Sequence, residues 1–443
     1  MSYQSNQIKQ SLAMQERAKK RIPGMTQLLS KRPDMFSLGV WPGYYERAAG
    51  AYIWDLDGNM YLDMSISGIG ANVLGYADPD VDERVAQAIR SGSSSTFNCP
   101  EEVLLAEMLA EIHPCCEMSR FTRSGGEAMA VAVRIARAHT GRDVVAFCGY
   151  HGWHDWYLAA NVGTGDALGN HLISGLAPEG VPSCLAGTAL PFRFNHIEEL
   201  ENIVSSHGKK IAAIILEPLR NTAPNDSFVR AVREAADETG AVLVIDEISS
   251  GFRMNTGGAH SLYGYEPDMV VFSKAMGNGY PIGAVCGKGT VMESAQKSFI
   301  SSTCWTERVG PSAALAMIEK HRNLDVGSHL MTMGQAIQEG WSGLFRKHSI
   351  PASVSGIYPL SHFDIEHELS REIKAFFVQE MLERGILAST LFYPMLSHTE
   401  EHVEKYLEAA EGVFGMISQH LEKGTLVSSL GGKPSSTGFQ RLT

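Results

Sequence analysis

Two carboxylates stand at the end of a strongly apolar stretch in the middle of the chain. Residues 241–245 are AVLVI, and Asp246 and Glu247 follow directly. A buried carboxylate is costly unless a partner compensates its charge. Successive side chains of a strand point to opposite faces, so the two acids need different partners. We expect Glu247 to pair with Arg253 or with a backbone amide, which leaves Asp246 for chemistry.

A lysine and a glycine-rich turn follow two other apolar stretches. Lys274 comes directly after MVVFS, where burying its ammonium is costly, so it either extends to solvent or has a chemical use. Ser124, Gly125 and Gly126 lie between an expected strand and an expected helix. Free N–H groups and the positive end of a helix favour a phosphate at such a turn. Each signal is weak by itself.

Together these features match the needs of pyridoxal phosphate. This cofactor has an aldehyde that reacts with an amine, a ring nitrogen that must stay protonated, and a phosphate. Lys274 would form the Schiff base, Asp246 would pair with the pyridinium, and the turn at Ser124, Gly125 and Gly126 would hold the phosphate. The pairing with the ring nitrogen would also remove the cost of burying Asp246.

Other ligand classes fit the sequence poorly. A P-loop needs G-x-x-x-x-G-K-[ST], and the nearest match has Ile282 at the first glycine and Gly289 at the hydroxyl position. The stretch GIGANVLG has Val73 at the third glycine of a dinucleotide fingerprint. His151 and His154 lack the spacing of a helical H-E-x-x-H pair and a third ligand, so we expect no metal site.

The elements that carry these residues follow one pattern. Between residues 80 and 325, apolar stretches of strand length alternate with segments of helical periodicity. This pattern is typical of an α/β fold with a mainly parallel sheet that is buried on both faces. Because the carboxyl ends of parallel strands open at one edge, Asp246, Lys274 and the glycine turn should meet there. The expected strands are RFTRS, DVVAFCG, IAAIILEP, AVLVIDE, MVVFSK and IGAVCG.

The chain divides into three segments of different character. Residues 1–75 contain a β-hairpin signal around Asp57 and Gly58. Residues 76–325 form the expected large cofactor-binding domain. Residues 326–443 carry longer amphipathic helices, the last with an apolar face between Val403 and Leu421. We expect the first and last segments to form one smaller α+β domain.

Composition narrows the partners and the compartment. The net charge of −12 disfavours nucleic acid and anionic membranes, which both need clustered cations. The first ten residues lack an apolar secretion signal, and no apolar run approaches the roughly 20 residues of a membrane helix, so we expect a cytoplasmic protein. The seven cysteines lack paired spacing and are expected to be reduced and buried.

Ordered motifs over nearly the whole chain resemble the class III aminotransferases, in the branch of glutamate-1-semialdehyde aminomutase. The resemblance implies fold type I of the pyridoxal-phosphate transferases, with a mainly parallel seven-stranded sheet flanked by helices. It also implies a homodimer with shared active sites. The motifs are GAYIWDLDGNMYLD, SGGEA, YHGWHDW, LEP, DEISSGFR, PDMVVFSKAMGNGYPIGA, SSTCWTE and LSHTEEHVEKYLEA.

The resemblance gives roles to further residues. It implies that Tyr150 stacks on the cofactor ring, that Ile248 packs on the opposite face and that Glu217 belongs to the cofactor site. Thr303 would reach the phosphate of the cofactor in the neighbouring subunit. The chain departs from the family pattern at Gly126, where threonine is usual, and at Ile248, where valine is commoner. After Thr303, CWTERVGPSAA replaces the usual Gly-Asn-Pro run.

The resemblance also favours a substrate class. In this branch an arginine within a stretch like LLSKRPDMF contacts a substrate carboxylate, and Arg32 stands at that place, which favours L-glutamate as donor or an acidic acceptor. The pattern is most similar to the sugar-modifying members that make 8-amino-3,8-dideoxy-manno-octulosonate for bacterial surface polysaccharide. A sugar acid would lie against an aromatic rim, for which the candidates are Trp41, Tyr44, Tyr45 and Trp305.

Three alternatives stay open. The first three of these aromatic residues fit a plain apolar core equally well. The reaction of a glutamate-1-semialdehyde aminomutase, which keeps the amine on one carbon skeleton, needs the same cofactor residues. An ω-amino-acid transaminase is the third alternative.

Overall fold

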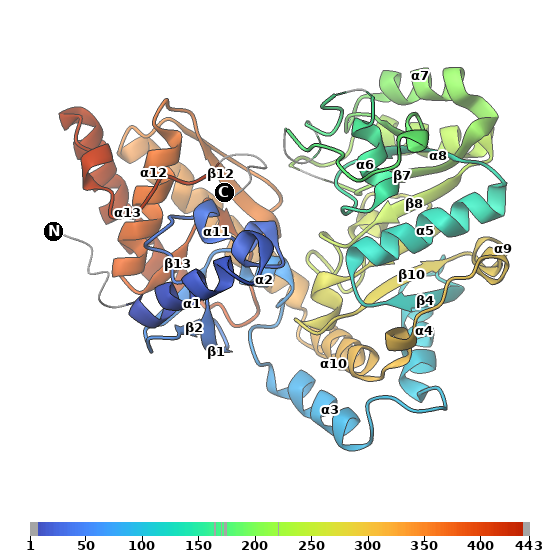
Figure 1. The fold of residues 1–443 in the computed structure, drawn as a ribbon, viewed down its shortest axis with the longest axis horizontal. Helices are drawn as coiled ribbons and strands as arrows, with labels where there is room; N and C mark the ends of the chain where they lie inside the picture. Colours follow the sequence, from blue (N-terminus) through green and yellow to red (C-terminus); the bar gives the residue numbers. More distant parts are fainter. Residues whose placement is uncertain (1–7, 164, 170, 172–174, 220, 437–443) are drawn as a thin grey trace. The chain divides into compact units, whose positions relative to one another are not determined.

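The structure is a computed structural model that describes residues 8–163, 165–169, 171, 175–219 and 221–436. Residues 1–7, on which the expected lack of a secretion signal partly rests, lie outside the described residues. Contacts divide the chain into two compact units (Figure 1). The large unit is residues 79–327, and the second unit combines the segments before residue 79 and after residue 327.

A seven-stranded sheet forms the centre of the large unit, in the order β4-β10-β9-β8-β7-β5-β6. The pairs from β9 to β6 are parallel, and β10 is antiparallel to both of its neighbours. The predicted mainly parallel sheet is therefore confirmed, and the short edge strand β6 is an addition that the sequence did not reveal. The strands are β4 (Met118–Thr122), β5 (Val144–Cys148), β6 (Ala189–Pro191), β7 (Ile211–Leu216), β8 (Val242–Asp246), β9 (Met269–Phe272) and β10 (Gly283–Gly287).

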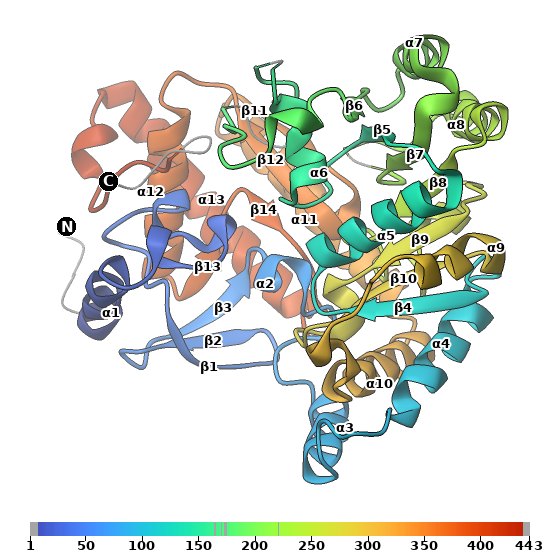
Figure 2. The ribbon, with the colours of Figure 1, turned by 45° about the vertical axis from the view of Figure 1, so that its right-hand side comes forward.

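Helices cover both faces of this sheet because its central strands are apolar on both sides. In β7, Ile215 packs in the core that contains α5, whereas Ile214 packs in the core that contains α7 and α8. Figure 2 shows α5 lying across the sheet. The helices of this unit are α3 (Pro79–Arg90), α4 (Pro100–Ile112), α5 (Gly125–Thr140), α6 (Asp155–Leu158), α7 (Ile197–His207), α8 (Asp226–Thr239), α9 (Gly289–Met292) and α10 (Val309–Asn323).

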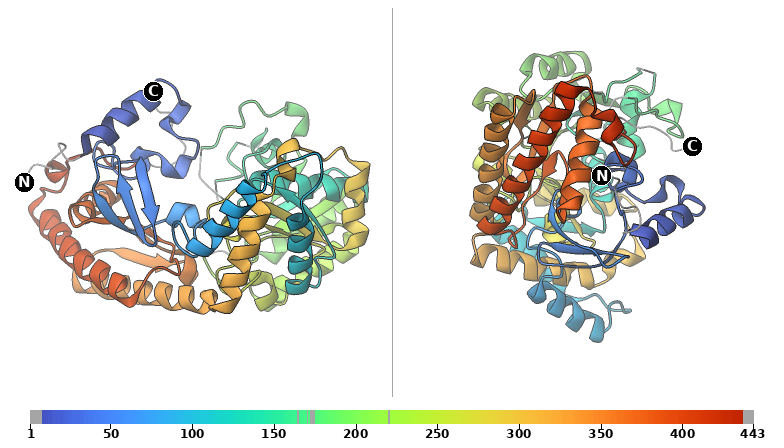
Figure 3. Two further views of the ribbon diagram at one scale, coloured as in Figure 1. Left: turned by 90° about the horizontal axis from the view of Figure 1, so that it is seen from below. Right: turned by 90° about the vertical axis from the view of Figure 1, so that its left-hand side faces the viewer.

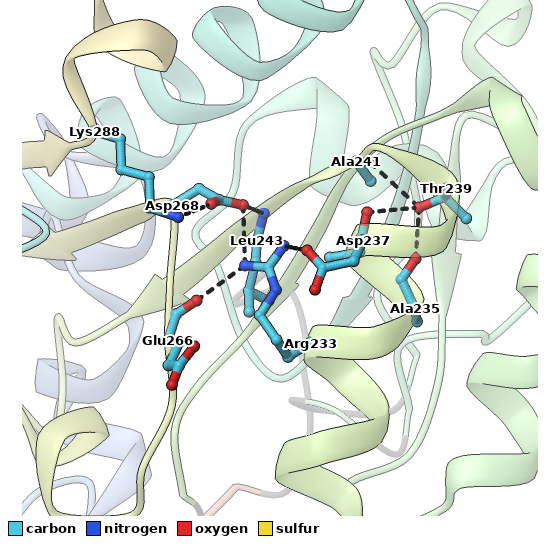
Figure 4. A network of polar contacts seen from close by, with 10 residues as sticks. Arg233, Ala235, Asp237, Thr239, Ala241, Leu243, Glu266, Asp268 and Lys288 are labelled. Atoms are coloured by element: carbon cyan, nitrogen blue, oxygen red, sulfur yellow. Dashed lines mark hydrogen bonds and ion pairs between the residues drawn. The ribbon is translucent and has the colours of Figure 1, made fainter.

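An ionic network joins the sheet to α8 at the edge where β8 and β9 begin (Figure 4). Asp268, just before β9, accepts hydrogen bonds from the Leu243 backbone N–H at 2.9 Å and from Lys288 Nζ at 2.7 Å. Arg233 of α8 donates to Asp268 at 3.2 Å and to Asp237 at 2.6 Å. Burial raises the pKa of Asp268, but the hydrogen bonds and the two cations outweigh it and lower that pKa.

The second unit contains two small sheets, ordered β1-β2-β3-β13 and β11-β12-β14. The predicted hairpin is confirmed, because β2 pairs antiparallel with β3 and Gly58 in the turn has a φ of 86°. The predicted apolar face of α13 is buried, and α13 lies beside α12 (Figure 3). In this core, Trp341 Nε1 of α11 donates to the Tyr406 hydroxyl at 2.9 Å.

The elements of the second unit are β1 (Tyr45–Ala49), β2 (Tyr52–Asp55), β3 (Met60–Met64), β11 (Ala352–Ser355), β12 (Ser361–Ile365), β13 (Ile386–Ala388), β14 (Leu391–Phe392), α1 (Lys9–Lys19), α2 (Ser67–Gly70), α12 (Ser370–Glu383) and α13 (Glu400–Lys423). The helix α11 (Val326–Lys347) starts at the boundary between the units.

All seven cysteines are free thiols. The expectation that they are buried holds for Cys116, Cys148 and Cys286. Cys99 and Cys115 are only half-buried, and the expectation is wrong for Cys184 and Cys304, which are exposed in short surface turns. Within the described part of the chain, no helix is long and apolar enough to cross a membrane.

Candidate active site

The predicted cofactor residues meet at one edge of the large sheet. Six of its strands run in the same direction, since β10 alone is antiparallel to its neighbours. Their carboxyl ends therefore open together, as a parallel sheet requires. In this way β4 leads to Ser124, β5 to Tyr150 and His151, β7 to Glu217, β8 to Asp246, and β9 to Lys274.

Asp246 is buried and paired with a histidine. It is 2% exposed, and its Oδ1 accepts the Ile248 N–H at 2.9 Å. Its Oδ2 lies 2.7 Å from Nδ1 of His151, and Nε2 of the same ring lies 3.2 Å from the Cys148 carbonyl oxygen. A carboxylate oxygen and a carbonyl oxygen both accept, so the imidazole is held between two acceptors. His151 thus fixes the orientation of the Asp246 carboxylate.

From the sequence, His151 was considered only as a metal ligand and rejected as one, and its place beside Asp246 was missed. The signal for it was its position directly after Tyr150, at the carboxyl end of β5. Within the described residues, no group of three potential ligands could hold a metal ion.

Glu247 points to the other side of β8 and has a structural partner. Its Oε1 accepts the His260 backbone N–H at 2.6 Å and lies 2.8 Å from Nδ1 of that ring. Ser250 donates its hydroxyl hydrogen to Oε2 at 2.5 Å. Of the two partners expected for Glu247, the structure shows the backbone amide.

Lys274 follows β9 in a strained backbone conformation, with a φ of 43°. Its Nζ donates to Ser249 Oγ at 2.7 Å. Burial lowers the pKa of Lys274, and the positive charge of Arg253 lowers it further, against the opposing effect of Asp246 and Glu217. A larger share of the amine is therefore neutral than in an exposed lysine, which favours reaction with an aldehyde.

The glycine turn forms the start of α5. Ser124 is the N-cap, and Gly125 and Gly126 are the first two helical residues. Their N–H groups lie in the first turn of the helix, where backbone N–H groups have no acceptor within the helix. A Cβ added to Gly125 would lie 3.0 Å from the Ile248 side chain, and one added to Gly126 would lie 2.9 Å from Cε1 of His154. The side chains of Ile248 and His154 therefore occupy the space beside Gly125 and Gly126 that a side chain at these positions would need.

Tyr150 and Glu217 lie beside each other at this edge. The Tyr150 N–H donates to Glu217 Oε2 at 3.2 Å, so the carboxylate holds the backbone that carries the aromatic ring. The ring also meets Tyr157 edge-on, with centroids 5.9 Å apart. Burial raises the pKa of the Tyr150 hydroxyl, and the charges of Asp246 and Glu217 raise it further.

Thr303 and Trp305 lie in one short turn of the large unit, residues 303–306. Arg123, at the end of β4, donates to the Trp305 carbonyl at 2.8 Å and so fixes this turn to the sheet. Thr303 is exposed in the single chain, whereas Trp305 is half-buried.

Arg32 belongs to the second unit and is 7% exposed. Its guanidinium makes a bidentate pair with Asp34, with Nε to Oδ1 at 3.0 Å and Nη2 to Oδ2 at 2.7 Å. Asp34 thus makes the bidentate contact with Arg32 that was expected of a substrate carboxylate.

The other three substrate candidates of this unit differ in environment. Trp41 stacks on Phe36, with centroids 3.9 Å apart and an interplanar angle of 4°, against an apolar cluster. The Tyr44 hydroxyl donates to the Met25 carbonyl at 2.8 Å. Tyr45 is 65% exposed. Trp41 is therefore part of an apolar core, as the alternative for these residues predicts, whereas the side chain of Tyr45 is exposed to solvent.

Comparisons with known proteins agree with this architecture. The family model "Aminotransferase class-III" matches residues 39–414. A 2'-deamino-2'-hydroxyneamine transaminase of Streptomyces kanamyceticus is 33% identical over 87% of this chain and 93% of its own length. A glutamate-1-semialdehyde 2,1-aminomutase of Nitrosomonas europaea is 32% identical over 93% of this chain and 98% of its own. A transaminase solved with PLP bound is 26% identical, with a TM-score of 0.81 over 93% of this chain and 99% of that one. The chain belongs to the class III aminotransferase family.

Proposed function

We propose that this aminotransferase uses pyridoxal phosphate to move an amino group from L-glutamate to a keto or aldehydo sugar acid. The acceptor class is that of 8-oxo-3,8-dideoxy-manno-octulosonate, in the biosynthesis of bacterial lipopolysaccharide sugars. The observation that carries the proposal is the meeting of Lys274, Asp246 and the start of α5 at one edge of the sheet.

The donor set at this edge fits the cofactor. Lys274 offers an amine with a lowered pKa to the aldehyde, and Asp246 offers a buried carboxylate to the ring nitrogen. Gly125 and Gly126 offer N–H groups at a helix start to the phosphate. Pyridoxal phosphate supplies a conjugated ring that stabilises negative charge on the substrate carbon.

The chain's own residues would hold and move the protons. As a neutral amine, Lys274 Nζ would carry the proton between the substrate carbon and the carbon of the cofactor's aldehyde group, and Ser249 Oγ, which accepts a hydrogen from Nζ, would orient it. Asp246 would accept the hydrogen of the ring nitrogen, and His151 fixes the orientation of this carboxylate. Tyr150 and Ile248 would pack on opposite faces of the ring, with Glu217 supporting Tyr150.

Two relatives support different acceptors. The transaminase named for 2'-deamino-2'-hydroxyneamine supports a hydroxylated acceptor, for which Trp305 and Tyr45 offer aromatic surface with polar tips. The aminomutase relative supports a second candidate, rearrangement of glutamate-1-semialdehyde. For Arg32 to bind a substrate carboxylate in either reaction, that carboxylate must replace Asp34.

One assay separates the two candidates. The purified protein, loaded with pyridoxal phosphate, is offered glutamate with 8-oxo-3,8-dideoxy-manno-octulosonate and, separately, glutamate-1-semialdehyde alone. We expect 2-oxoglutarate and the amino sugar in the first reaction and no product in the second. Conversion of the semialdehyde without turnover of the sugar would identify an aminomutase.

A further inference from the structure

We propose that Cys115 is a site of oxidation by hydrogen peroxide, with its thiolate activated by His260 and Glu247. These three residues belong to the large unit and lie apart from the cofactor residues, because Glu247 and Asp246 point to opposite sides of β8. Oxidation of this thiol needs neither the donor nor the acceptor of the proposed function.

The turn that follows α4 brings Cys115 to His260. In this turn, residues 113–116, the Cys116 backbone N–H donates to the His113 carbonyl at 2.8 Å. The His113 ring lies against the His260 ring, with centroids 5.1 Å apart and an interplanar angle of 36°. The side chains of Cys115 and His260 form a hydrogen bond. Cys115 is half-buried, so part of its side chain is open to a molecule as small as peroxide.

The His260 ring is held between a carboxylate and a thiol. Its Nδ1 lies 2.8 Å from Glu247 Oε1, and its backbone N–H donates to the same oxygen at 2.6 Å. Because Nδ1 faces the carboxylate, Nε2 is the ring nitrogen that remains for the Cys115 sulfur. Glu247 thus orients the imidazole and stabilises its positive charge, as the third group does beside an activated nucleophile and its base.

The charges of this cluster favour a thiolate at Cys115. Burial lowers the pKa of His260, but the hydrogen bonds with Cys115 and Glu247 outweigh burial and raise that pKa to about 9. The ring is therefore an imidazolium near pH 7. Hydrogen bonds with Cys116 and His260 lower the pKa of Cys115, against the opposing effect of burial. The His113 ring adds no charge, because burial and then the charge of His260 lower its pKa to about 3.

The neighbouring cysteine keeps its proton. Hydrogen bonds with Cys115 and Cys286 raise the pKa of the buried Cys116 thiol, and burial raises it further. Cys116 therefore donates its hydrogen to the Cys115 sulfur, and only one thiol of the adjacent pair is ionised. A thiolate that lies beside a cation and is partly open to solvent is the kind that peroxide oxidises selectively.

In the reaction, the Cys115 sulfur attacks one oxygen of hydrogen peroxide. The S–O bond forms as the O–O bond breaks, so the sulfur is oxidised by two electrons and the peroxide is reduced. The departing hydroxide takes the proton of the His260 imidazolium and leaves as water. The products are a sulfenic acid at Cys115, one water molecule and a neutral His260.

Peroxide labelling of the full-length protein loaded with pyridoxal phosphate tests the site. The protein is treated at pH 6, where a thiol with the ordinary pKa near 8.5 is less than about 1% ionised. Dimedone traps the sulfenic acids, and mass spectrometry of the peptides gives the extent at each cysteine. We expect Cys115 to be labelled ahead of Cys184 and Cys304, although both of these are more exposed. Labelling of either one ahead of Cys115 overturns the proposal.

The pH profile of alkylation by iodoacetamide measures the ionisation of Cys115. Between pH 6 and 8, the rate for an ordinary thiol rises about tenfold per pH unit, in step with its thiolate fraction. Wild-type Cys115 should show a smaller rise, because its pKa is lowered. His260→Gln removes the cation, so it should restore the tenfold rise and slow the peroxide labelling of Cys115 at pH 6 roughly tenfold or more.

The matched control is His139→Gln in the same unit, where Nδ1 pairs with Ser294 Oγ at 3.3 Å. It should leave the rates at Cys115 unchanged, and the labelling of Cys184 should be the same in all variants. Circular dichroism shows whether each variant folds, and the wild-type profile decides the question even if His260→Gln does not. A tenfold rise per pH unit at wild-type Cys115, or an unchanged rate at Cys115 in folded His260→Gln, overturns the proposal.

Discussion

The alternation of side chains along β8 separates two neighbouring acids into different roles. Asp246 pairs with His151 at the carboxyl edge of the sheet, whereas Glu247 pairs with His260 and Ser250 on the other side of the strand. Both carboxylates are buried, and each has hydrogen-bond donors that compensate the cost. Only Asp246 lies beside the buried amine of Lys274, whose pKa it influences.

Lys274→Ala should abolish turnover and leave the protein folded, because only the amine is removed and the backbone of the turn is kept. The measurement is amino transfer from glutamate, together with the visible absorbance of the bound cofactor and a circular dichroism spectrum. Retention of the wild-type absorbance band would show that another lysine binds the cofactor.

Asp246→Asn should lower kcat by at least roughly a hundredfold, since an amide cannot stabilise a protonated ring nitrogen. His151→Asn keeps a donor for the carboxylate and should cost less, roughly tenfold, because this histidine acts through Asp246. The measurement is kcat for both variants, with the absorbance maximum of the bound cofactor as a second readout. A larger loss for His151→Asn than for Asp246→Asn would contradict this order.

At the scale of elements, the two edges of the large sheet carry different kinds of polar groups. The carboxyl ends of β5, β7, β8 and β9 present the residues of the candidate site. Where β8 and β9 begin, the network around Asp268 ties these strands to α8 and to Lys288 after β10 (Figure 4). The network at this edge stabilises the sheet. The strained backbone conformation of Lys274 lies at the opposite edge, where it costs stability.

Asp268→Asn should lower the free energy of unfolding by about 1–3 kcal/mol at pH 7, because it removes the charge that Lys288 and Arg233 share. The folded-state pKa of Asp268 is lowered, so its contribution is fully present above the unfolded value near 4 and is lost as the pH falls through the folded value. Denaturant midpoints of both proteins should therefore differ at pH 7 and converge as the pH falls below the unfolded value near 4.

The control for this prediction is Asp237→Asn. Asp237 contacts the same arginine, but its side chain is 67% exposed, so its loss should cost less than about 1 kcal/mol. Equal losses for the two variants would show that the ion pairs, and not the burial of Asp268, set the effect.

At the scale of the whole molecule, the exposure of Thr303 bears on the homodimer that the family resemblance implies. Thr303 lies in a turn that Arg123 fixes through Trp305 and Glu307, yet its own side chain is exposed in the single chain. A fixed turn with an exposed hydroxyl suits a contact with a second copy of the chain. It is compatible with the homodimer with shared active sites that the family resemblance implies.

Mixed dimers of Lys274→Ala and Thr303→Val subunits test the shared site. If Thr303 serves the partner's cofactor, one site of a mixed dimer has both defects and the other is intact. Such dimers should therefore show about half of the wild-type activity. The measurement combines light scattering, which should give the mass of a dimer, with activity of the reassembled mixture. Activity no higher than that of the two parent variants would contradict the shared arrangement.

The sequence alone determined six strands of the large sheet, the hairpin, the apolar face of α13 and the residues at the strand ends, because each follows from local periodicity and turn chemistry. Only the tertiary structure decided which partners these residues find. It paired Asp246 with His151, 95 residues away along the chain, and placed His154 against Gly126. It also showed that Arg32 forms an ion pair with Asp34 and that Trp41 stacks on Phe36. The long-range contacts of Asp246 and Gly126 depend on how separate elements pack in three dimensions, and local sequence patterns carry no record of that packing.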